Sequence, residues 1–399
     1  MSLTAEKVAQ AVSIVGEAGL DAWMTFVRET GEGGDPVLPL ILGQTLTWQS
    51  ALIVTRTGER IAIVGNFEED AVKSIGAWTQ VVGYVKGIRD VLCDTLRRLD
   101  PKRIGINFSK DDVKADGLSY GMYLVLLDHL KGTPYRDRLE SAGAVCGALR
   151  SRKTPNELER IRRAIREAEA IFEEAGRFAE IGMTERQLAD FMKQRAQARG
   201  VGLAWEPAGC PIVNTGPNSM IGHGLPGDIR IEPGHLLHID FGVVVDGYCS
   251  DLQRMWYVPE PGETSPPAQA QRAFDTVASA IRRSAAALKP GVLGWQIDEI
   301  ARTTLTDAGF PEYQHGLGHN VGRAAHDGGA LLGPKWERYG KTPEIPVEAG
   351  NVFTLEPSIL NADGRGCLGL EEMILVTPKG CEFLSNAQER LVLLTNRQE

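Results

Sequence analysis

Four carboxylates in the second half of the chain lie in two segments that read as hairpins. In residues 235–251, apolar residues alternate with polar ones, and Asp246-Gly247 is a strong signal for a two-residue hairpin turn. That turn places Asp240 opposite Gln253, with Asp251 diagonal to Asp240 on the same face at roughly 7–8 Å. Two carboxylates at that separation can bind one cation or hold two. The alternative is that both are solvated residues of an edge hairpin.

The second segment, residues 352–376, has two apolar runs around a loop rich in Asn, Asp and Gly. A turn centred on Asp363-Gly364 places Glu356 directly opposite Glu371. Like charges in that position destabilise a sheet, and burying them unpaired costs more, so a bound cation would resolve both problems. The alternatives are that one glutamate points to solvent, that the register slips, or that Glu372 points inward in place of Glu371.

Three histidines interleaved with glycine occupy residues 315–326. A single histidine is more often a core residue than a ligand, but three in a loop where glycine permits close approach to a ligand favour a site. His319 is the best metal-ligand candidate, with His315 and His326 as groups beside it. His223 lies in another Gly/Pro loop, 17 residues before Asp240.

The charge of these groups indicates how many ions they could hold. Four carboxylates carry −4, which two divalent ions balance and one does not. A set of oxygen ligands with one imidazole suits Mn(II), Co(II), Mg(II) or Zn(II), and does not suit the thiolate-rich structural zinc class. Two such ions would produce a nucleophilic hydroxide near neutral pH and polarise a carbonyl group.

The elements that must position these residues fall into two domains, as 399 residues suggest. Residues 1–150 alternate short apolar runs with helical segments near 89–99 and 111–131, and runs at 52–55 and 61–64 predict a hairpin. These patterns indicate a small α/β domain. Helices over about 155–178, with Pro155 at the first position, and 184–199 open a second domain, residues 151–399.

Composition limits the class of protein. With 43% hydrophobic and 24% charged residues the chain is soluble and globular, and a net charge of −9 argues against a nucleic-acid partner. No stretch reaches the ~18 apolar residues of a membrane span, and we expect no signal peptide because Glu6, Lys7 and Glu17 interrupt any apolar region near residue 1. Six cysteines without CxxC spacing indicate reduced thiols. We therefore expect a cytoplasmic protein with no membrane partner.

The order Asp240, Asp251, His319, Glu356 and Glu371 resembles that of the pita-bread dinuclear metallopeptidases. This group includes prolidase, Xaa-Pro aminopeptidase and methionine aminopeptidase, and creatinase shares its fold without the metals. The resemblance covers about residues 151–380. It implies an α+β chain, with a C-terminal pita-bread catalytic domain behind a smaller, creatinase-like α/β N-terminal domain.

The resemblance also implies roles for the residues. All five would bind two divalent ions, for which we favour Mn(II) over Co(II) or Zn(II), and Asp251 and Glu371 would bridge the ions. A metal-bridging hydroxide would attack the scissile carbonyl, and Glu356 would carry its proton to the leaving nitrogen. The implied catalytic residues are Glu356, His326 and His223, and the implied substrate-binding residues are His223, His315 and His326.

The sequence departs from the family pattern at four places. Gly369 stands where many prolidases and Xaa-Pro aminopeptidases have an Arg that, in prolidases, helps to hold the substrate's C-terminal carboxylate. Arg323 replaces an aliphatic residue, and we hypothesise that Arg323 or Arg365 binds that carboxylate instead; the alternative is an ion pair with a surface acid. Gln253 replaces the usual Thr. The segment 331–346 is longer than expected; we interpret it as a surface loop or dimer contact, and the alternative is a lid or pocket wall over the substrate.

The predicted function is that of a metal-dependent Xaa-Pro dipeptidase acting on small peptides with proline after the scissile bond, in a homodimer. An Xaa-Pro aminopeptidase acting on longer peptides is the first alternative. A metal-dependent hydrolase or lyase acting on a non-peptide compound is the second, because fold does not fix function. A catalytically inactive binding module is the third, although such relatives usually lose ligands.

Overall fold

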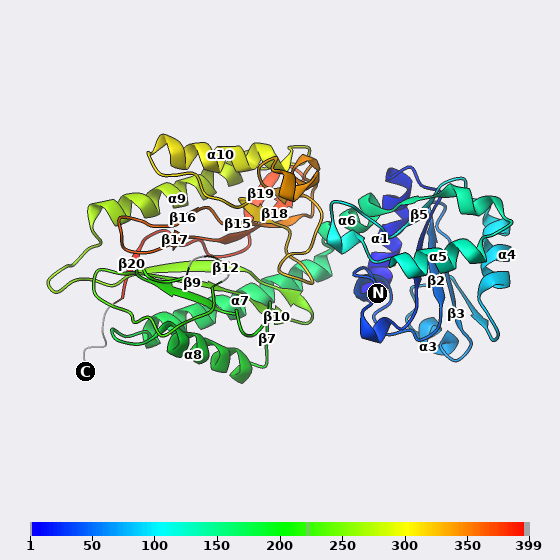
Figure 1. The fold of residues 1–399 in the computed structure, drawn as a ribbon, viewed down its shortest axis with the longest axis horizontal. Coiled ribbons are helices and arrows are strands. Elements are labelled where there is room, and N and C mark those ends of the chain that lie inside the picture. Colours follow the sequence, from blue (N-terminus) through cyan, green and yellow to red (C-terminus); the bar gives the residue numbers. More distant parts are fainter. Residues whose placement is uncertain (1, 221, 223, 395–399) are drawn as a thin grey trace. The chain divides into compact units, whose positions relative to one another are not determined.

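The computed structural model describes residues 2–220, 222 and 224–394 and divides the chain into two compact units, Met1–Thr154 and Pro155–Glu399 (Figure 1). Each unit combines helices with at least one β-sheet. This is the mixed α/β, two-domain architecture that the sequence predicts.

The first unit is built on one six-stranded sheet in the order β4-β3-β2-β1-β5-β6. The predicted hairpin over 52–55 and 61–64 is present as β2 and β3, which pair antiparallel. The strands are β1 (Ala22–Val27), β2 (Ser50–Thr55), β3 (Arg60–Gly65), β4 (Gln80–Tyr84), β5 (Ile104–Ile106) and β6 (Leu139–Ser141).

Helices cover both faces of this sheet (Figure 1). One apolar cluster joins the sheet to α1 and α6, and a second joins it to α4 and α5. The expected helix over 111–131 is only half correct, because Ser119 caps a helix that begins at residue 120. The helices are α1 (Leu3–Glu17), α2 (Leu38–Ile41), α3 (Glu69–Ser74), α4 (Arg89–Leu99), α5 (Tyr120–His129) and α6 (Gly143–Ser151), with 3₁₀ turns at Thr30–Glu32, Val113–Ala115 and Pro134–Arg138.

The second unit opens with two long helices, as predicted. In α7 (Pro155–Phe178) proline is the first helical residue, where its missing N–H is harmless. In α8 (Glu185–Ala198) the Thr184 side chain accepts from the Gln187 backbone N–H and the Gln187 side chain accepts from that of Thr184, which forms a capping box. Two further helices follow, α9 (Ala268–Ala287) and α10 (Gly294–Asp307).

Short sheets lie between these helices (Figure 1). One has the order β20-β12-β9-β8, with β8 (Ile212–Thr215), β9 (Leu236–Phe241), β12 (Leu252–Tyr257) and β20 (Val392–Leu393). A second contains β7 (Gly202–Leu203), β10 (Val243–Val245) and β11 (Tyr248–Cys249), and a third contains β15 (Val352–Leu355), β18 (Glu372–Thr377) and β19 (Gly380–Phe383). Two-stranded pairs are β13 (Gly318–His319) with β14 (Leu331–Leu332), and β16 (Ser358–Ile359) with β17 (Leu368–Gly369).

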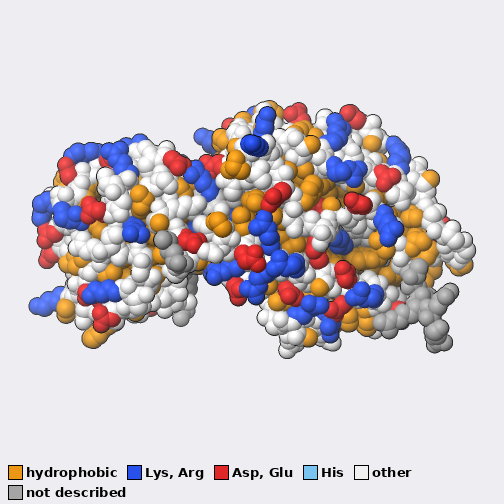
Figure 2. Space-filling model, turned by 180° about the vertical axis from the view of Figure 1, so that it is seen from behind, with side chains coloured by type: hydrophobic (Ala, Val, Ile, Leu, Met, Phe, Trp, Pro, Cys, Tyr) orange, Lys and Arg blue, Asp and Glu red, His pale blue; other side chains and the backbone are white. Residues whose placement is uncertain are grey.

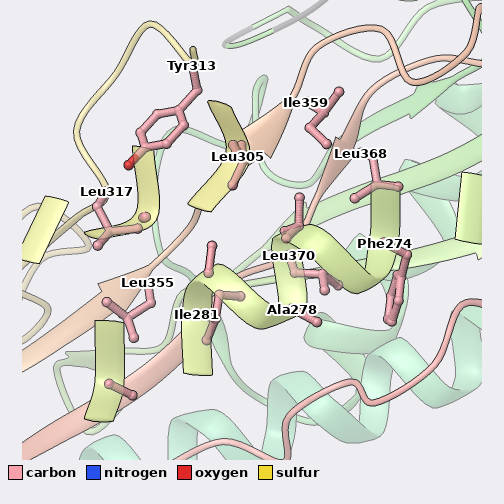
Figure 3. Close-up of a cluster of buried hydrophobic side chains, with 14 of the residues drawn as sticks. Phe274, Ala278, Ile281, Leu305, Tyr313, Leu317, Leu355, Ile359, Leu368 and Leu370 are labelled. Carbon is pink, nitrogen blue, oxygen red and sulfur yellow. The ribbon is translucent and has the colours of Figure 1, made fainter. Parts of the chain in front are cut away.

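The core of the second unit lies where α9 packs on the strands that carry the glutamates. Figure 3 shows Ala278 and Ile281 of α9 in one cluster with Leu355, Leu368 and Leu370. Because successive side chains of a strand point to opposite faces, the residues next to these leucines point away from the helix. The core packing therefore turns positions 356, 369 and 371 toward the other hairpin.

The surface carries acidic and basic side chains close together. On the face in Figure 2, Lys and Arg are interspersed with Asp and Glu. Arg199, which follows the last residue of α8, pairs for example with Glu167 and Glu174 of α7 at 2.9 and 2.6 Å. None of the helices in the described part of the chain has the length and apolar character of a membrane span.

Candidate metal centre

The first hairpin has the register that its turn predicts. Asp240 of β9 pairs with Gln253 of β12. Asp246 and Gly247 both have positive φ, 50° and 76°, as a type I′ turn requires. Asp251 therefore lies diagonal to Asp240 on the same face, and both carboxylates are largely or fully withdrawn from solvent.

The second hairpin also has the predicted register. Leu355 pairs with Glu372 and Ser358 pairs with Gly369, so Glu356 and Glu371 occupy opposite positions between these pairs. Asp363 and Gly364 again have positive φ, 56° and 69°. Glu371 is 1% exposed and its N–H bonds to the carbonyl of Gln253 at 3.4 Å, which joins the two hairpins.

His319 reaches the carboxylates from a third segment. Its backbone N–H donates to Thr354 Oγ1 at 3.1 Å, and a Cβ at Gly318 would collide with the Thr354 carbonyl, so glycine permits this approach. His319 Nε2 lies 3.4 Å from Glu356 Oε1 and 3.7 Å from Asp251 Oδ2. The candidate ligand atoms of Asp251, His319 and Glu371 all lie within 4.8 Å of one another.

Burial shifts the protonation of all five groups toward neutrality. It raises the pKa of Asp240 to about 7. It raises the pKa of Asp251, Glu356 and Glu371 well above the ordinary range, and the charges of neighbouring carboxylates add to the rise. Burial, with a smaller contribution from His326, lowers the pKa of His319 to about 3. A neutral imidazole is the form that binds a metal.

The donor set fits divalent cations. Asp240 Oδ1 and Glu371 Oε2 are buried and have no hydrogen-bond partner among the described residues. A buried carboxylate oxygen without a partner is costly unless a cation completes it. Four carboxylates and one neutral imidazole match two divalent ions in charge and in ligand type.

Glu372 takes no part in this cluster. Its carboxylate pairs with Arg254 at 3.1 Å and accepts from Ser385 Oγ at 2.6 Å and from the Gln388 N–H at 2.9 Å. The structure therefore resolves the alternative left open by the sequence, because Glu371 is the glutamate that joins Asp251 and His319.

Two of the three other candidate histidines border the cluster. The exposed His326 ring stands edge to face with that of His319, with 4.1 Å between centroids. His315 Nε2 lies 2.8 Å from Oγ of Ser358, two residues beyond Glu356, and burial lowers the pKa of His315. His223 lies outside the described residues.

The two arginines considered as carboxylate clamps are already engaged. The Arg323 guanidinium lies over the Tyr248 ring, 5.4 Å from its centroid. Arg365 donates to the Gly234 carbonyl at 2.9 Å and lies 3.6 Å from the Asp363 carboxylate. Substrate binding by Arg323 stays a hypothesis, and these contacts give it no support.

Sequence reasoning assigned no role to two polar neighbours of Glu356, or to the histidine that contacts one of them. Thr354 Oγ1 lies 3.5 Å from Glu356 Oε1, and Gln253 Nε2 lies 3.4 Å from Glu356 Oε2. His238 Nε2 in turn lies 2.8 Å from Gln253 Oε1. Strand alternation places His238 on the same face as Asp240. This pattern in the sequence could have indicated that His238 lies near the site.

The 331–346 segment contacts the histidine segment. It contains β14 and the 3₁₀ turns Glu337–Tyr339 and Thr342–Glu344. Arg302 of α10 lies between the rings of Tyr313 and Trp336, at 4.2 and 4.8 Å from their centroids, and donates to the His315 carbonyl. Tyr339 Oη accepts from the Gly316 N–H at 3.0 Å. These contacts stabilise the backbone beside His315.

Tyr339→Phe is expected to weaken this support. It leaves the Gly316 N–H without its acceptor, which costs about 1 kcal/mol of stability. Because Gly316 adjoins His315, we expect KM for a peptide substrate to rise several-fold while kcat changes less. Urea unfolding and steady-state kinetics measure the two effects. Tyr120→Phe, at an exposed tyrosine, is the control; equal KM values for both variants would contradict the expectation.

A family comparison decides what kind of centre this is. The model of metallopeptidase family M24 matches residues 159–378, more than half of the chain. The chain belongs to metallopeptidase family M24. The matched region contains all five candidate ligands, Asp240, Asp251, His319, Glu356 and Glu371.

Relatives and solved structures agree with this assignment. The chain is 29% identical to an uncharacterized peptidase of Staphylococcus saprophyticus, over 85% of this chain and 88% of that one. An X-Pro aminopeptidase from Thermotoga maritima has a similar fold, with a TM-score of 0.70, 23% identity, and coverage of 98% of this chain and 99% of that one. An Xaa-Pro dipeptidase from Bacillus anthracis gives a TM-score of 0.74, with 22% identity and the same coverage. This M24 peptidase therefore has the pita-bread fold that the ligand order suggested.

Proposed function

We propose that this M24 peptidase hydrolyses the peptide bond that precedes proline, with two divalent ions held by Asp240, Asp251, His319, Glu356 and Glu371. The observation that carries the proposal is the convergence of four largely buried carboxylates on one neutral imidazole: Asp251, His319 and Glu371 form one cluster, and the charges of Asp240 and Glu356 act on it. The preference for proline rests on the names of the structural neighbours, an Xaa-Pro dipeptidase and an X-Pro aminopeptidase. Mn(II) is the ion we favour.

When bound, the two ions supply an activated water and positive charge for the developing oxyanion. Glu356, whose Oε1 lies 3.4 Å from His319 Nε2 and whose Oε2 lies 3.4 Å from Gln253 Nε2, would help to hold the ions and would carry a proton to the leaving prolyl nitrogen. His326 is exposed beside His319, where it can donate to the substrate.

A dipeptidase and an aminopeptidase differ in what they bind on the C-terminal side of the substrate. A dipeptidase holds the free carboxylate of proline, and an aminopeptidase does not require one. Position 369 is glycine, so no Arg stands there to hold a substrate carboxylate, and a Cβ at this position would displace the Gln253 amide, whose Oε1 would lie 2.5 Å away. The contacts of Arg323 and Arg365 likewise engage these guanidinium groups elsewhere. This arrangement favours the second candidate, an Xaa-Pro aminopeptidase that does not require a free carboxylate on proline.

The test is to load the apo-protein with Mn(II), Co(II) or Zn(II) and to compare Ala-Pro, Ala-Pro-Ala and Ala-Ala. We expect cleavage of the first bond of both proline peptides and at least tenfold slower cleavage of Ala-Ala. Cleavage of Ala-Pro alone would select the dipeptidase. If no peptide were cleaved with two metals bound per chain, the proline proposal would be lost and a non-peptide substrate would replace it.

A further inference from the structure

Gln253 is the residue at which the two carboxylate hairpins meet. It pairs with Asp240 across β9 and β12, and its carbonyl accepts from the Glu371 N–H at 3.4 Å. Its side chain lies on the same face of the hairpin as that of Asp240. The residue is buried, with 8% of its surface exposed. Hydrogen bonds that orient the Gln253 side chain can therefore affect the carboxylates of both hairpins.

The Gln253 amide has a defined orientation. Gln253 Nε2 donates to Glu356 Oε2 at 3.4 Å, which is the arrangement that an ionised, metal-binding Glu356 requires. The oxygen then faces His238 Nε2, at 2.8 Å, and this nitrogen carries the proton of the contact. In this tautomer Nδ1 is an acceptor, so Asn214 Oδ1, 3.2 Å away, borders the ring without donating to it or accepting from it. His238 thus donates to Gln253, and Gln253 donates to Glu356.

Gly369 supplies the space for this chain. A Cβ there would lie 2.5 Å from Gln253 Oε1 and 3.1 Å from His238 Nε2. The φ angle of Gly369 lies outside the left-handed region, so backbone conformation does not require glycine. The three atoms nearest to that Cβ all belong to the Gln253 and His238 side chains. The two departures from the family pattern, at 253 and at 369, therefore form one packing unit.

We propose that Gln253 is a positioning residue that sets the carboxylate plane of Glu356, with His238 fixing the amide and Gly369 leaving room for it. Thr354 contacts the other oxygen of Glu356, so the two polar groups hold the carboxylate from both ends. The inference rests on the proposed function for the catalytic role of Glu356, but its effect on metal binding does not depend on which substrate is cleaved. Outer partners of metal ligands typically contribute 10–100-fold in affinity or activity.

Gln253→Met tests the proposal without adding charge, because methionine has a similar length and forms neither hydrogen bond. We expect kcat to fall about 10–100-fold, KM to change less than threefold, and metal dissociation constants from calorimetry to rise about tenfold. Gln197→Met, at an exposed glutamine of α8, is the matched control. Unchanged kcat and unchanged metal affinity in a folded Gln253→Met protein would overturn the inference.

A double-mutant cycle tests the packing unit and remains informative if Gln253→Met folds poorly. Gly369→Ala alone should push the amide off Glu356 and lower kcat about tenfold, with weaker metal binding. In a Gln253→Ala background, which removes the amide, Gly369→Ala should cause no further loss. Independent, multiplicative losses would contradict the proposal. If the parent protein cleaved no proline peptide, the metal affinities alone would decide this inference, so the two proposals fail separately.

Discussion

Glu371→Gln is expected to abolish peptidase activity, while the same change at the next residue is expected to leave most of it. A direct ligand should contribute more than the 10–100-fold typical of outer partners, so we expect at least a roughly 10³-fold loss of kcat/KM for Glu371→Gln. Glu372 touches Arg254 and Ser385 instead of the other carboxylates, so Glu372→Gln should keep two metals per chain and activity within about threefold.

The stabilities of the two variants should change in opposite directions. In the metal-free protein, Glu371→Gln removes one of four buried carboxylates that raise one another's pKa, so the free energy of unfolding should rise. Glu372→Gln removes the nearer of the two acidic partners of the buried Arg254 and leaves Glu169 at 3.9 Å, which should lower the free energy of unfolding by up to about 3 kcal/mol. Urea unfolding in chelator, metal analysis and kinetics on both proteins measure these effects. Equal losses of metal from both would contradict the assignment of Glu371.

The sequence predicted the hairpins well because a two-residue turn fixes the pairing of every residue beyond it. Asp246-Gly247 and Asp363-Gly364 both adopt the positive φ angles that such turns need, and both registers follow. Buried leucines on alternate positions then decide which face the acids take. Local turn chemistry and strand alternation are thus sufficient to place the carboxylates within each hairpin.

Contacts between segments distant in sequence could not be predicted in the same way. Gln253 and Gly369 are 116 positions apart, and each was noticed only as a departure from the family pattern. The contact of Tyr339 with Gly316 depends on the path of an irregular segment. In the first unit, the helical spacing of 111–131 gave no sign of the irregular stretch that precedes the Ser119 cap. Periodicity predicts which face is buried, but it does not tell which other segment covers that face.

Removing the metal ions is expected to make the stability of the protein depend strongly on pH. Each carboxylate of the centre has a pKa that is higher in the folded protein than in the unfolded chain, because burial disfavours its charged form. Such a group stabilises the fold fully at a pH below its unfolded value, near 4, and this contribution is lost as pH rises through the folded value, about 7 for Asp240. The apo-protein should therefore lose stability between about pH 4 and pH 8, by roughly 4 kcal/mol from Asp240 alone at most.

Bound metal should reverse this trend, because ions bind the deprotonated ligands and their binding free energy adds to the stability of the fold. Urea midpoints measured from pH 4.5 to pH 8 should fall with pH in chelator and rise with pH in saturating Mn(II), so that the two curves diverge toward pH 8. Glu371→Gln provides the control, since it should flatten both curves. An apo-protein whose stability does not change over this range would mean that the carboxylates are hydrated in solution. The number of charges would then be no reason to expect two ions. Only carboxylates that are shielded from water and repel one another need cations to neutralise them.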